Sequence, residues 1–315
     1  MEIFTTTLSQ MAFLFSLIIV GYLMAKLKVV QEDASGVLAK MENFVFIPAL
    51  VLVTFIDKFT LKSLSTMWKP LVISMIVLGI AIPLAMLAAL LLSRKDRYIR
   101  NIYTYGLCFS NFGFMGNAIV SQLYPDYFFE YLIFTLPLWM GIYVWGAPSL
   151  LMSGSGQKMT FAQRCKSFWN PMFIAMVIGM IIGLSGVAVP GWISATLNSA
   201  SGCMSPVAML LTGITVASTD LKKTFTNLKI YLISAVRLLV FPAIAFAALY
   251  FIPMQESTLI CVVCSLAMPL GLNTIVIPSA YGKDTTEAAG MAIVSHLLSC
   301  LTIPVVLLVL SKILL

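Results

Sequence analysis

The sequence predicts an all-α polytopic membrane protein with ten transmembrane helices, arranged as two inverted five-helix repeats in which helices 4 and 9 are broken and cross. Three observations predict this fold. Of the 315 residues, 60% are hydrophobic and only 10% are charged, and the mean hydropathy is +1.01, whereas soluble domains carry about 25% charged residues. Apolar runs of membrane-spanning length recur along the whole chain. The residues that interrupt them recur at matching places in the two halves.

Ten apolar runs are long enough, at roughly 20 residues each, to cross a hydrocarbon core of about 30 Å as helices. The first run lacks the basic residues that precede a cleaved signal peptide, because Glu2 is the only charged residue before Lys26, so we expect it to remain as a span. The predicted spans lie near residues 5–25, 35–56, 69–92, 101–122, 127–152, 169–186, 192–218, 229–252, 256–281 and 286–311.

Basic residues indicate the orientation of the spans, since cytoplasmic loops carry an excess of Lys and Arg. With the N-terminus outside, thirteen basic residues fall in cytoplasmic loops and four on the outer side. Both termini then face outward, and we expect the protein in the cell (inner) membrane. The net charge of +7 therefore reflects membrane orientation, not a nucleic-acid partner. The cytoplasmic set is Lys26, Lys28, Arg94, Lys95, Arg97, Arg100, Lys158, Arg164, Lys166, Lys222, Lys223, Lys229 and Lys283, and the outer set is Lys58, Lys62, Lys69 and Lys312.

Unusual residues recur at a near-constant separation between the halves, with three pairs 158 residues apart, one pair 159 and one pair 156. Because each half holds an odd number of spans, the halves insert with opposite orientation, as in many secondary transporters. The predicted organisation is a first repeat over 1–152, a cytoplasmic connecting loop over 153–168 and a second, inverted repeat over 169–315. The pairs are, in order, Gly21 with Gly179, Pro48 with Pro206, Thr54 with Thr212, Pro83 with Pro242, and Asn117 with Asn273.

Two hydrophobic stretches are interrupted by small, polar and helix-breaking residues, one in span 4 and one in span 9. They read SNFGFMGN over 110–117 and MPLGLN over 268–273. Unwound backbone is tolerated at membrane depth only where it is buried in protein or lines a cavity. A matched pair of such breaks indicates a transporter's binding site. Each break also creates a half-helix N-terminus, where free N–H groups and the helix dipole attract an anion without Lys or Arg.

The predicted substrate-binding residues belong to these two breaks. Asn side chains supply donors and acceptors, glycines allow close approach of the crossing segment, and Pro269 leaves a carbonyl one turn back unpaired. The alternative is that these residues only permit kinking and tight packing, as small residues do in many membrane proteins. The set comprises Ser110, Asn111, Gly113, Gly116, Asn117, Pro269, Gly271, Asn273 and Thr274.

Ionisable residues inside spans are functional hypotheses by default. His296, the only histidine, is expected near the middle of span 10, where it would suit proton coupling. The alternative is a neutral imidazole bonded to a backbone carbonyl. Arg237 is expected to be shallow enough in span 8 to extend toward the cytoplasm. Glu42 is expected at an interfacial start of span 2.

The sequence does not indicate an enzyme. The spans contain no His/Glu metal motif and no Ser–His arrangement with a third partner. Cys261 and Cys264 have the C-x-x-C spacing, but they lie in an apolar run without a second pair or a nearby histidine, so we interpret them as buried apolar side chains. Catalytic residues, cofactors and metals are therefore not expected.

At these residues the chain resembles the auxin efflux carrier family, whose bacterial members include malate and malonate permeases. The resemblance covers essentially the whole chain and rests on SNFGFMG over 110–116, AMP over 267–269 with Asn273, AYGKD over 280–284, and VSHLLSCLTIP over 294–304. It implies a fold like the bile-acid/sodium symporters, with a substrate site between a scaffold and a transport domain and an elevator-like motion. It also implies a homodimer built through the scaffold around spans 2 and 7.

The sequence thus predicts a secondary active transporter of small organic anions, carboxylates such as malate, malonate or auxin-like acids, with H⁺ or Na⁺ as the coupling ion. The alternative is a ligand-binding membrane sensor or regulator that uses the same crossing without transport. The chain departs from the family's pattern at Asn117-Ala118 and at Pro278. It departs again at His296, where the family more often has a hydroxyl residue, so a coupling role there is not inherited from the family.

Overall fold

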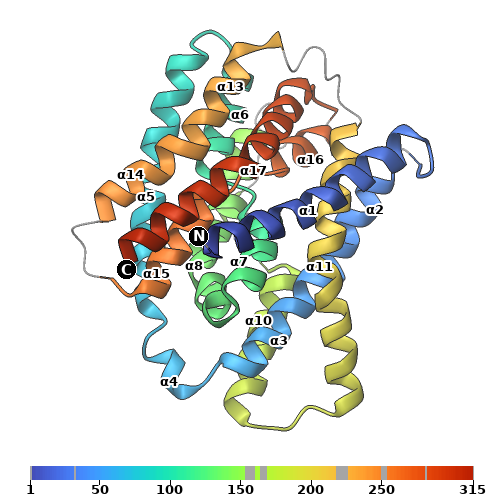
Figure 1. Ribbon diagram of the computed structural model, residues 1–315, viewed down its shortest axis with the longest axis vertical. Helices are drawn as coiled ribbons and strands as arrows, with labels where there is room; N and C mark the ends of the chain where they lie inside the picture. Colours follow the sequence, from blue (N-terminus) through green and yellow to red (C-terminus); the bar gives the residue numbers. More distant parts are fainter. Residues whose placement is uncertain are drawn as a thin grey trace.

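The computed structural model describes residues 2–31, 33–152, 160–163, 169–217, 226–249, 254–280 and 282–314. Within these residues the chain is a bundle of helices (Figure 1). Among them, extended backbone is paired only in a bridge between Ser110 and Leu270. The predicted connecting loop, 153–168, lies outside the described residues at 153–159 and 164–168.

In the first half of the chain, helices follow the predicted spans, and π-helical turns interrupt or extend several of them. The elements are α1 (Glu2–Lys26), α2 (Ala34–Met41), η1 (Glu42–Phe46), α3 (Ile47–Lys58), α4 (Leu61–Leu64), α5 (Trp68–Leu92), α6 (Arg97–Cys108), η2 (Phe112–Gly116), α7 (Asn117–Leu123), η3 (Pro125–Tyr127), α8 (Phe128–Gly141) and η4 (Ile142–Leu151). Of these, η1, η2 and η4 are π-helical, and η3 is a short 3₁₀ turn.

The second half repeats this pattern with one π-helical turn, η5. Its elements are α10 (Pro171–Ser185), α11 (Gly191–Ala217), α13 (Leu228–Ala235), η5 (Val236–Val240), α14 (Phe241–Leu249), α15 (Glu256–Ala267), α16 (Asn273–Ala280) and α17 (Thr286–Leu314).

Local sequence explains where several helices begin and end. The Asp96 carboxylate accepts from the Ile99 N–H and caps α6, and Asn170 caps α10, whose first residue is a proline. Gly186 ends α10 in the left-handed conformation, with φ at 64°, which costs glycine little.

Helical residues occupy each of the ten predicted spans. Seven helical segments of the described residues are long and apolar enough to cross a membrane, and Pro171–Ser185 and Glu256–Ala267 are shorter apolar helices. The prediction of a polytopic helical membrane protein is therefore confirmed. The count of ten crossings and the inverted orientation of the second half stay predictions.

Close glycine contacts join α1 to α11 and α10 to α3, and α2 packs on α11; these five helices are called here the glycine-packed group. Gly21 of α1 faces the backbone of α11, and Gly213 of α11 faces the backbone of α1. Gly179 and Gly183 of α10 face the backbone of α3. Because Gly21 and Gly179 are one of the pairs 158 residues apart, the same kind of contact forms between spans 1 and 7 and between spans 6 and 2.

The remaining long helices form a second group, called here the crossing group, which comprises α5 to α8 and α13 to α17. In it, α5 packs against α6 and α8, and the second half repeats this arrangement with α14 on α15 and α13 on α17. The two groups touch where η2 and α7 lie on α11 and where α1 lies on α17. The broken span 4 therefore lies at the boundary between the groups, and span 9 crosses it within the second group.

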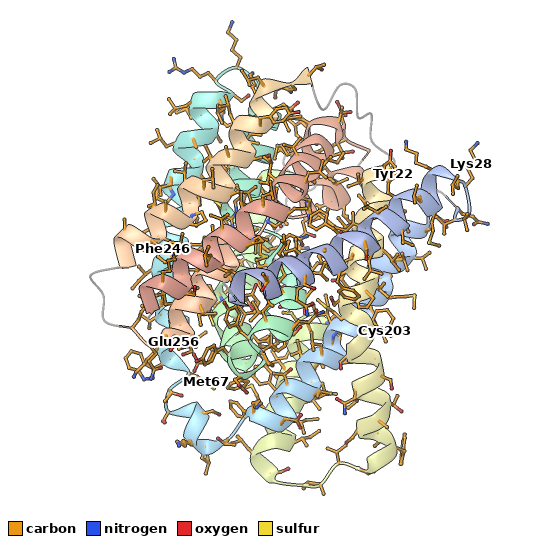
Figure 2. The ribbon with its side chains drawn as sticks, viewed as in Figure 1. Tyr22, Lys28, Met67, Cys203, Phe246 and Glu256 are labelled. Carbon is orange, nitrogen blue, oxygen red and sulfur yellow. The ribbon has the colours of Figure 1, made fainter. Side chains whose placement is uncertain are left out.

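Successive connections lie at opposite ends of the bundle. In Figure 1 the α5–α6 connection is at the top, whereas α4 and the α10–α11 turn are at the bottom. Figure 2 places Lys28, after α1, at the upper right, and Met67 and Glu256 at the lower left. This alternation agrees with a chain that passes back and forth across a membrane.

Two ionisable residues are more buried than their positions in the sequence predict. Glu42 is fully buried, at 0% exposure, although we predicted an interfacial position. Arg237 is 1% exposed and does not extend toward the cytoplasm. The prediction for Arg237 was wrong, because the π-helical turn η5 packs its side chain against neighbouring helices. Glu42 lies in the π-helical turn η1, and its burial is greater than we expected, whereas its depth in the membrane stays a prediction.

Candidate functional site

The two broken spans meet through their backbones. α6 ends at Cys108 and α15 at Ala267, and the residues that follow, Phe109 and Met268, have extended dihedral angles. There Ser110 and Leu270 form an antiparallel bridge, and the Asn111 N–H donates to the Pro269 carbonyl over 2.7 Å. The predicted breaks in spans 4 and 9 therefore exist and cross each other, and the bridge pairs backbone that would otherwise be unsatisfied at membrane depth.

Two serines tie the crossing to its neighbours. The Ser110 hydroxyl donates to the Ser265 carbonyl in α15 over 2.6 Å. The Leu270 N–H donates to the Ser295 hydroxyl in α17 over 3.1 Å. Buried polar groups are thus paired in both unwound segments, and Ser110 has a structural partner of its own.

Asn111 and His296 form one hydrogen-bonded unit. His296 Nδ1 lies 2.7 Å from the Ala292 carbonyl, and His296 Nε2 lies 3.0 Å from Asn111 Nδ2. A carbonyl only accepts, so Nδ1 carries the proton, and Nε2 of the neutral ring accepts from the Asn111 amide. Both nitrogens of the predicted coupling residue are therefore engaged, and one of them directly contacts a predicted substrate-binding residue.

Two amide oxygens in the first break have no hydrogen-bond partner within the described part of the chain. Asn111 and Asn117 are each 2% exposed, and the Oδ1 atom of each is buried and unpaired. An unsatisfied buried acceptor costs about 1–3 kcal/mol. The crossing therefore offers acceptors to a bound molecule that supplies N–H or O–H groups, and in this conformation it is closed to solvent.

The predicted glycines are needed for packing. A Cβ added to Gly113 would come within 2.5 Å of the Trp139 ring, and one added to Gly116 would overlap the Tyr131 hydroxyl. That hydroxyl donates to the Phe112 carbonyl over 3.0 Å. Gly113 and Gly116 thus let α8 approach η2. Gly271 likewise allows the crossing itself, because its Cβ would lie 3.1 Å from the Ser110 carbonyl oxygen.

Asn273 and Thr274 lie at the start of α16, beyond the second break. The Asn273 amide donates to the Tyr105 hydroxyl over 3.2 Å and is only partly buried. The Thr274 hydroxyl is fully buried and donates to the Gly271 carbonyl over 2.8 Å. Each of the three predicted asparagines therefore has its own environment, and no hydrogen bond between them is present in the described part of the chain.

Arg237 is the residue at this site that the sequence prediction missed. Its guanidinium donates to three backbone carbonyls, those of Leu107 at 2.7 Å, Ser265 at 3.1 Å and Met268 at 3.3 Å. Leu107 belongs to the end of α6, and the other two carbonyls belong to the end of α15 and the residue after it. One side chain thus holds the C-terminal ends of both half-helices beside the crossing.

A signal for Arg237 was present in the sequence. Each half-helix that ends inside the membrane leaves carbonyls without an intrahelical donor and a partial negative charge of about one half. The unpaired carbonyls at two such ends need several hydrogen-bond donors, and the two partial charges are balanced by about one positive charge. Arg237 is the only lysine or arginine within the predicted interior of spans 3 to 10, and its rigid fork of donors suits this role better than lysine.

Comparison with known proteins assigns nearly the whole chain to one protein family. A family model described as a membrane transport protein matches it twice, over residues 6–165 and over residues 156–307. No curated protein matches the chain. The two matches overlap at residues 156–165, within the predicted connecting loop.

Proposed function

The chain belongs to the membrane transport protein family of auxin efflux carrier-like proteins, and from that membership we propose that it is a secondary active transporter of small organic anions. The observation that carries the choice of an anion is the charge at the crossing. Arg237 is buried there, and all of its hydrogen-bond partners among the described residues are backbone carbonyls. Its charge is therefore not cancelled by a carboxylate.

The helix dipoles support the same choice. Arg237 compensates the partial negative charges at the ends of α6 and α15. The helix that begins at Phe112 and continues through α7 presents its N-terminal N–H groups on the other side of the break, and this end carries a partial positive charge. With the C-terminal ends compensated, the field at the crossing is net positive, which favours a carboxylate.

The unpaired amide oxygens narrow the substrate further. Asn111 Oδ1 and Asn117 Oδ1 need donors, which a simple carboxylate lacks. A substrate that carries a hydroxyl, an N–H or a second, protonated carboxyl group would bond to them. Malate, a hydroxy dicarboxylate, meets both requirements, and indole-3-acetate offers a ring N–H. Ser110, Gly113, Gly116, Pro269, Gly271 and Thr274 shape this site through the backbone, and Asn273 completes it from α16.

His296 is proposed as the residue that couples protons at the substrate side. If the ring gains a proton, Nε2 becomes a donor and can no longer accept from the Asn111 amide. Rotation of that amide by half a turn restores the hydrogen bond through Oδ1 and presents the NH₂ group to the substrate instead. Protonation would then add positive charge and replace an acceptor by a donor, and both changes favour an anion.

Alternating access is proposed to follow from movement of the crossing group against the glycine-packed group. The glycine contacts make the first group a closely packed unit, and the broken span 4 lies at its boundary with the second. An elevator-type motion would carry the site across the bilayer. We further propose a homodimer through spans 2 and 7 and a cell (inner) membrane location with both termini outside.

Counterflow in proteoliposomes tests this proposal. Proteoliposomes that contain the purified protein are loaded with unlabelled malate, malonate or indole-3-acetate, and uptake of the same labelled compound is followed. We expect counterflow of at least one compound, and its loss in Asn111→Ala and Asn273→Ala. Asn198→Ala, an exposed asparagine on α11, is the matched control and should exchange normally.

The alternative outcomes separate the rival functions. Saturable binding of a compound without its counterflow would favour a sensor or regulator that uses the same crossing. Counterflow that persists in both crossing variants would move the substrate site elsewhere in the chain.

A further inference from the structure

A buried acidic residue lies in the glycine-packed group, away from the crossing. Glu42 is the first residue of η1, the π-helical turn inside span 2, and it is 0% exposed. Among the residues that the structure describes, neither of its carboxyl oxygens has a hydrogen-bond partner. π-helical turns within α-helices occur frequently at functional sites, and an ionisable residue at membrane depth is a functional hypothesis by default.

The helices around Glu42 supply no partner for a negative charge. η1 packs against α2, α3, α10 and α11. α10 has no titratable side chain, and α11 has only Cys203, which is exposed. Lys40 of α2 is exposed, as are Asp57 and Lys58 at the far end of α3. An ionised Glu42 would therefore be an isolated charge in an apolar interior, which is strongly unfavourable.

Glu42 must accordingly be neutral in this conformation. A proton can neutralise it without any further ligand from the protein. A bound metal cation requires several oxygen ligands in a suitable geometry. In the described part of the chain no cluster of His, Cys, Asp or Glu side chains could hold a metal ion, and neither carboxyl oxygen of Glu42 has a hydrogen-bond partner. The surroundings therefore fit the protonated acid better than a carboxylate with Na⁺.

We propose that Glu42 is a proton-binding site that couples transport to the proton gradient, an inference that rests on the transport function proposed above. The carboxylate takes one proton from water in a conformation that exposes it, and the acid returns that proton to water on the other side. No electron moves and no covalent bond other than O–H changes. Conversion between the conformations requires the neutral acid, because the charged form is excluded from the closed interior.

α11 connects this site to the crossing. It packs on η1 and also on η2 and α7, and the Gln122 amide of α7 donates to the Ser205 hydroxyl of α11 over 3.2 Å. Because α11 contacts both α7 and the turn that holds Glu42, a shift of α7 along α11 changes the packing around Glu42. Glu42 and His296 thus lie in different groups, so the two proton sites can be separated experimentally.

Proteoliposomes that contain Glu42→Gln test the proposal. Gln cannot bind a proton reversibly, so we expect counterflow of labelled malate to continue, while accumulation driven by an imposed pH gradient falls clearly below that of the wild type, because the transported proton at Glu42 is lost and only the site at His296 remains. Glu42→Asp keeps a titratable group and should retain part of the accumulation. Glu256→Gln, at the exposed start of α15 (Figure 2), is the matched control.

Several outcomes would overturn the inference. Wild-type accumulation in Glu42→Gln would exclude Glu42 as the coupling site, and a response to a Na⁺ gradient that this variant loses would replace the proton by Na⁺. Absence of wild-type counterflow for malate, malonate and indole-3-acetate would instead count against the proposed transport function.

A second measurement tests the protonation state of Glu42 directly and does not depend on transport activity. The infrared difference spectrum between wild type and Glu42→Gln in lipid should contain the C=O band of a neutral carboxylic acid. If the wild-type protein lacks that band in this difference, or shows a carboxylate band in its place, Glu42 is charged and the proposal is wrong.

Discussion

At the scale of single residues, Arg237 has the clearest structural role. Its three carbonyl partners come from two helices that end inside the membrane, so it joins the halves of the crossing and supplies its positive charge. A structural and an electrostatic role make different predictions, because lysine keeps the charge and glutamine keeps some of the donors.

We expect Arg237→Gln to raise KM for an anionic substrate more than Arg237→Lys does, because only the former removes the charge. Both variants should be less stable, since each carbonyl that loses its donor costs about 1–3 kcal/mol. KM from counterflow and thermal unfolding in detergent measure the two effects. Equal KM values for wild type and Arg237→Gln, at comparable folded fractions, would show that this charge does not attract the substrate.

His296→Gln provides the matching test at the Asn111 unit. Gln can donate to the Ala292 carbonyl and accept from Asn111, as the neutral ring does, but it cannot gain a proton. In the wild type, substrate affinity should rise as the pH falls, because protonation turns the Asn111 amide to present donors. In the variant this dependence should be lost.

The measurement for His296 is the pH dependence of KM, made with a substrate whose own ionisation is constant over the range. A pH profile equal to that of the wild type would leave the ring with only the structural role of holding Asn111.

The sequence predicted which residues form the two breaks, but it did not predict the burial of two ionisable residues. The composition of the two breaks identified Ser110, Asn111 and Pro269, which meet at the crossing. The burial of Glu42 and Arg237 was not predicted, because exposure was inferred from the distance of each residue to the end of its span. A π-helical turn shifts which side of a helix a residue faces, and single-sequence periodicity does not reveal it.

At the scale of elements, the glycine contacts determine how closely helices approach. A Cβ on Gly213 would overlap the Ile18 carbonyl and lie 2.7 Å from the Tyr22 nitrogen, both backbone atoms of α1. Gly202 lies on the same helix with no atom within 4 Å of an added Cβ. The two positions therefore form a matched pair for one substitution.

Gly213→Ala should destabilise the protein by about 1–3 kcal/mol or more, since α1 and α11 must move apart. Gly202→Ala should be neutral or stabilising by up to about 1 kcal/mol, because alanine has the higher helix propensity. Thermal unfolding in the same detergent measures both. Similar unfolding temperatures for the two variants would contradict the close packing of α1 on α11.

The elements themselves were largely predictable. Strong apolar runs located the helices, and Gly and Pro located both breaks, because these signals are local in sequence. The meeting of the breaks as a backbone bridge is not local: it depends on how the two halves pack, and the matching offset between Asn117 and Asn273 was its only trace in the sequence.

At the scale of the whole molecule, the division into a glycine-packed group and a crossing group is the basis of the proposed mechanism. Gln122 and Ser205 bond across the boundary between them, where α7 lies on α11. If transport requires one group to move against the other, a covalent link at this boundary must stop it. If the site opens by local rearrangement within the crossing group, the same link should matter little.

We therefore expect a short bifunctional maleimide to abolish transport in the double variant Gln122→Cys with Ser205→Cys. Each single variant, treated in the same way, controls for reaction at exposed Cys203 and should keep its counterflow. The link is verified by mass spectrometry of the α7 and α11 peptides. Full linkage with unchanged counterflow would contradict relative movement of the two groups, whereas loss confined to the linked protein requires that movement, because the link adds no bulk at the crossing itself.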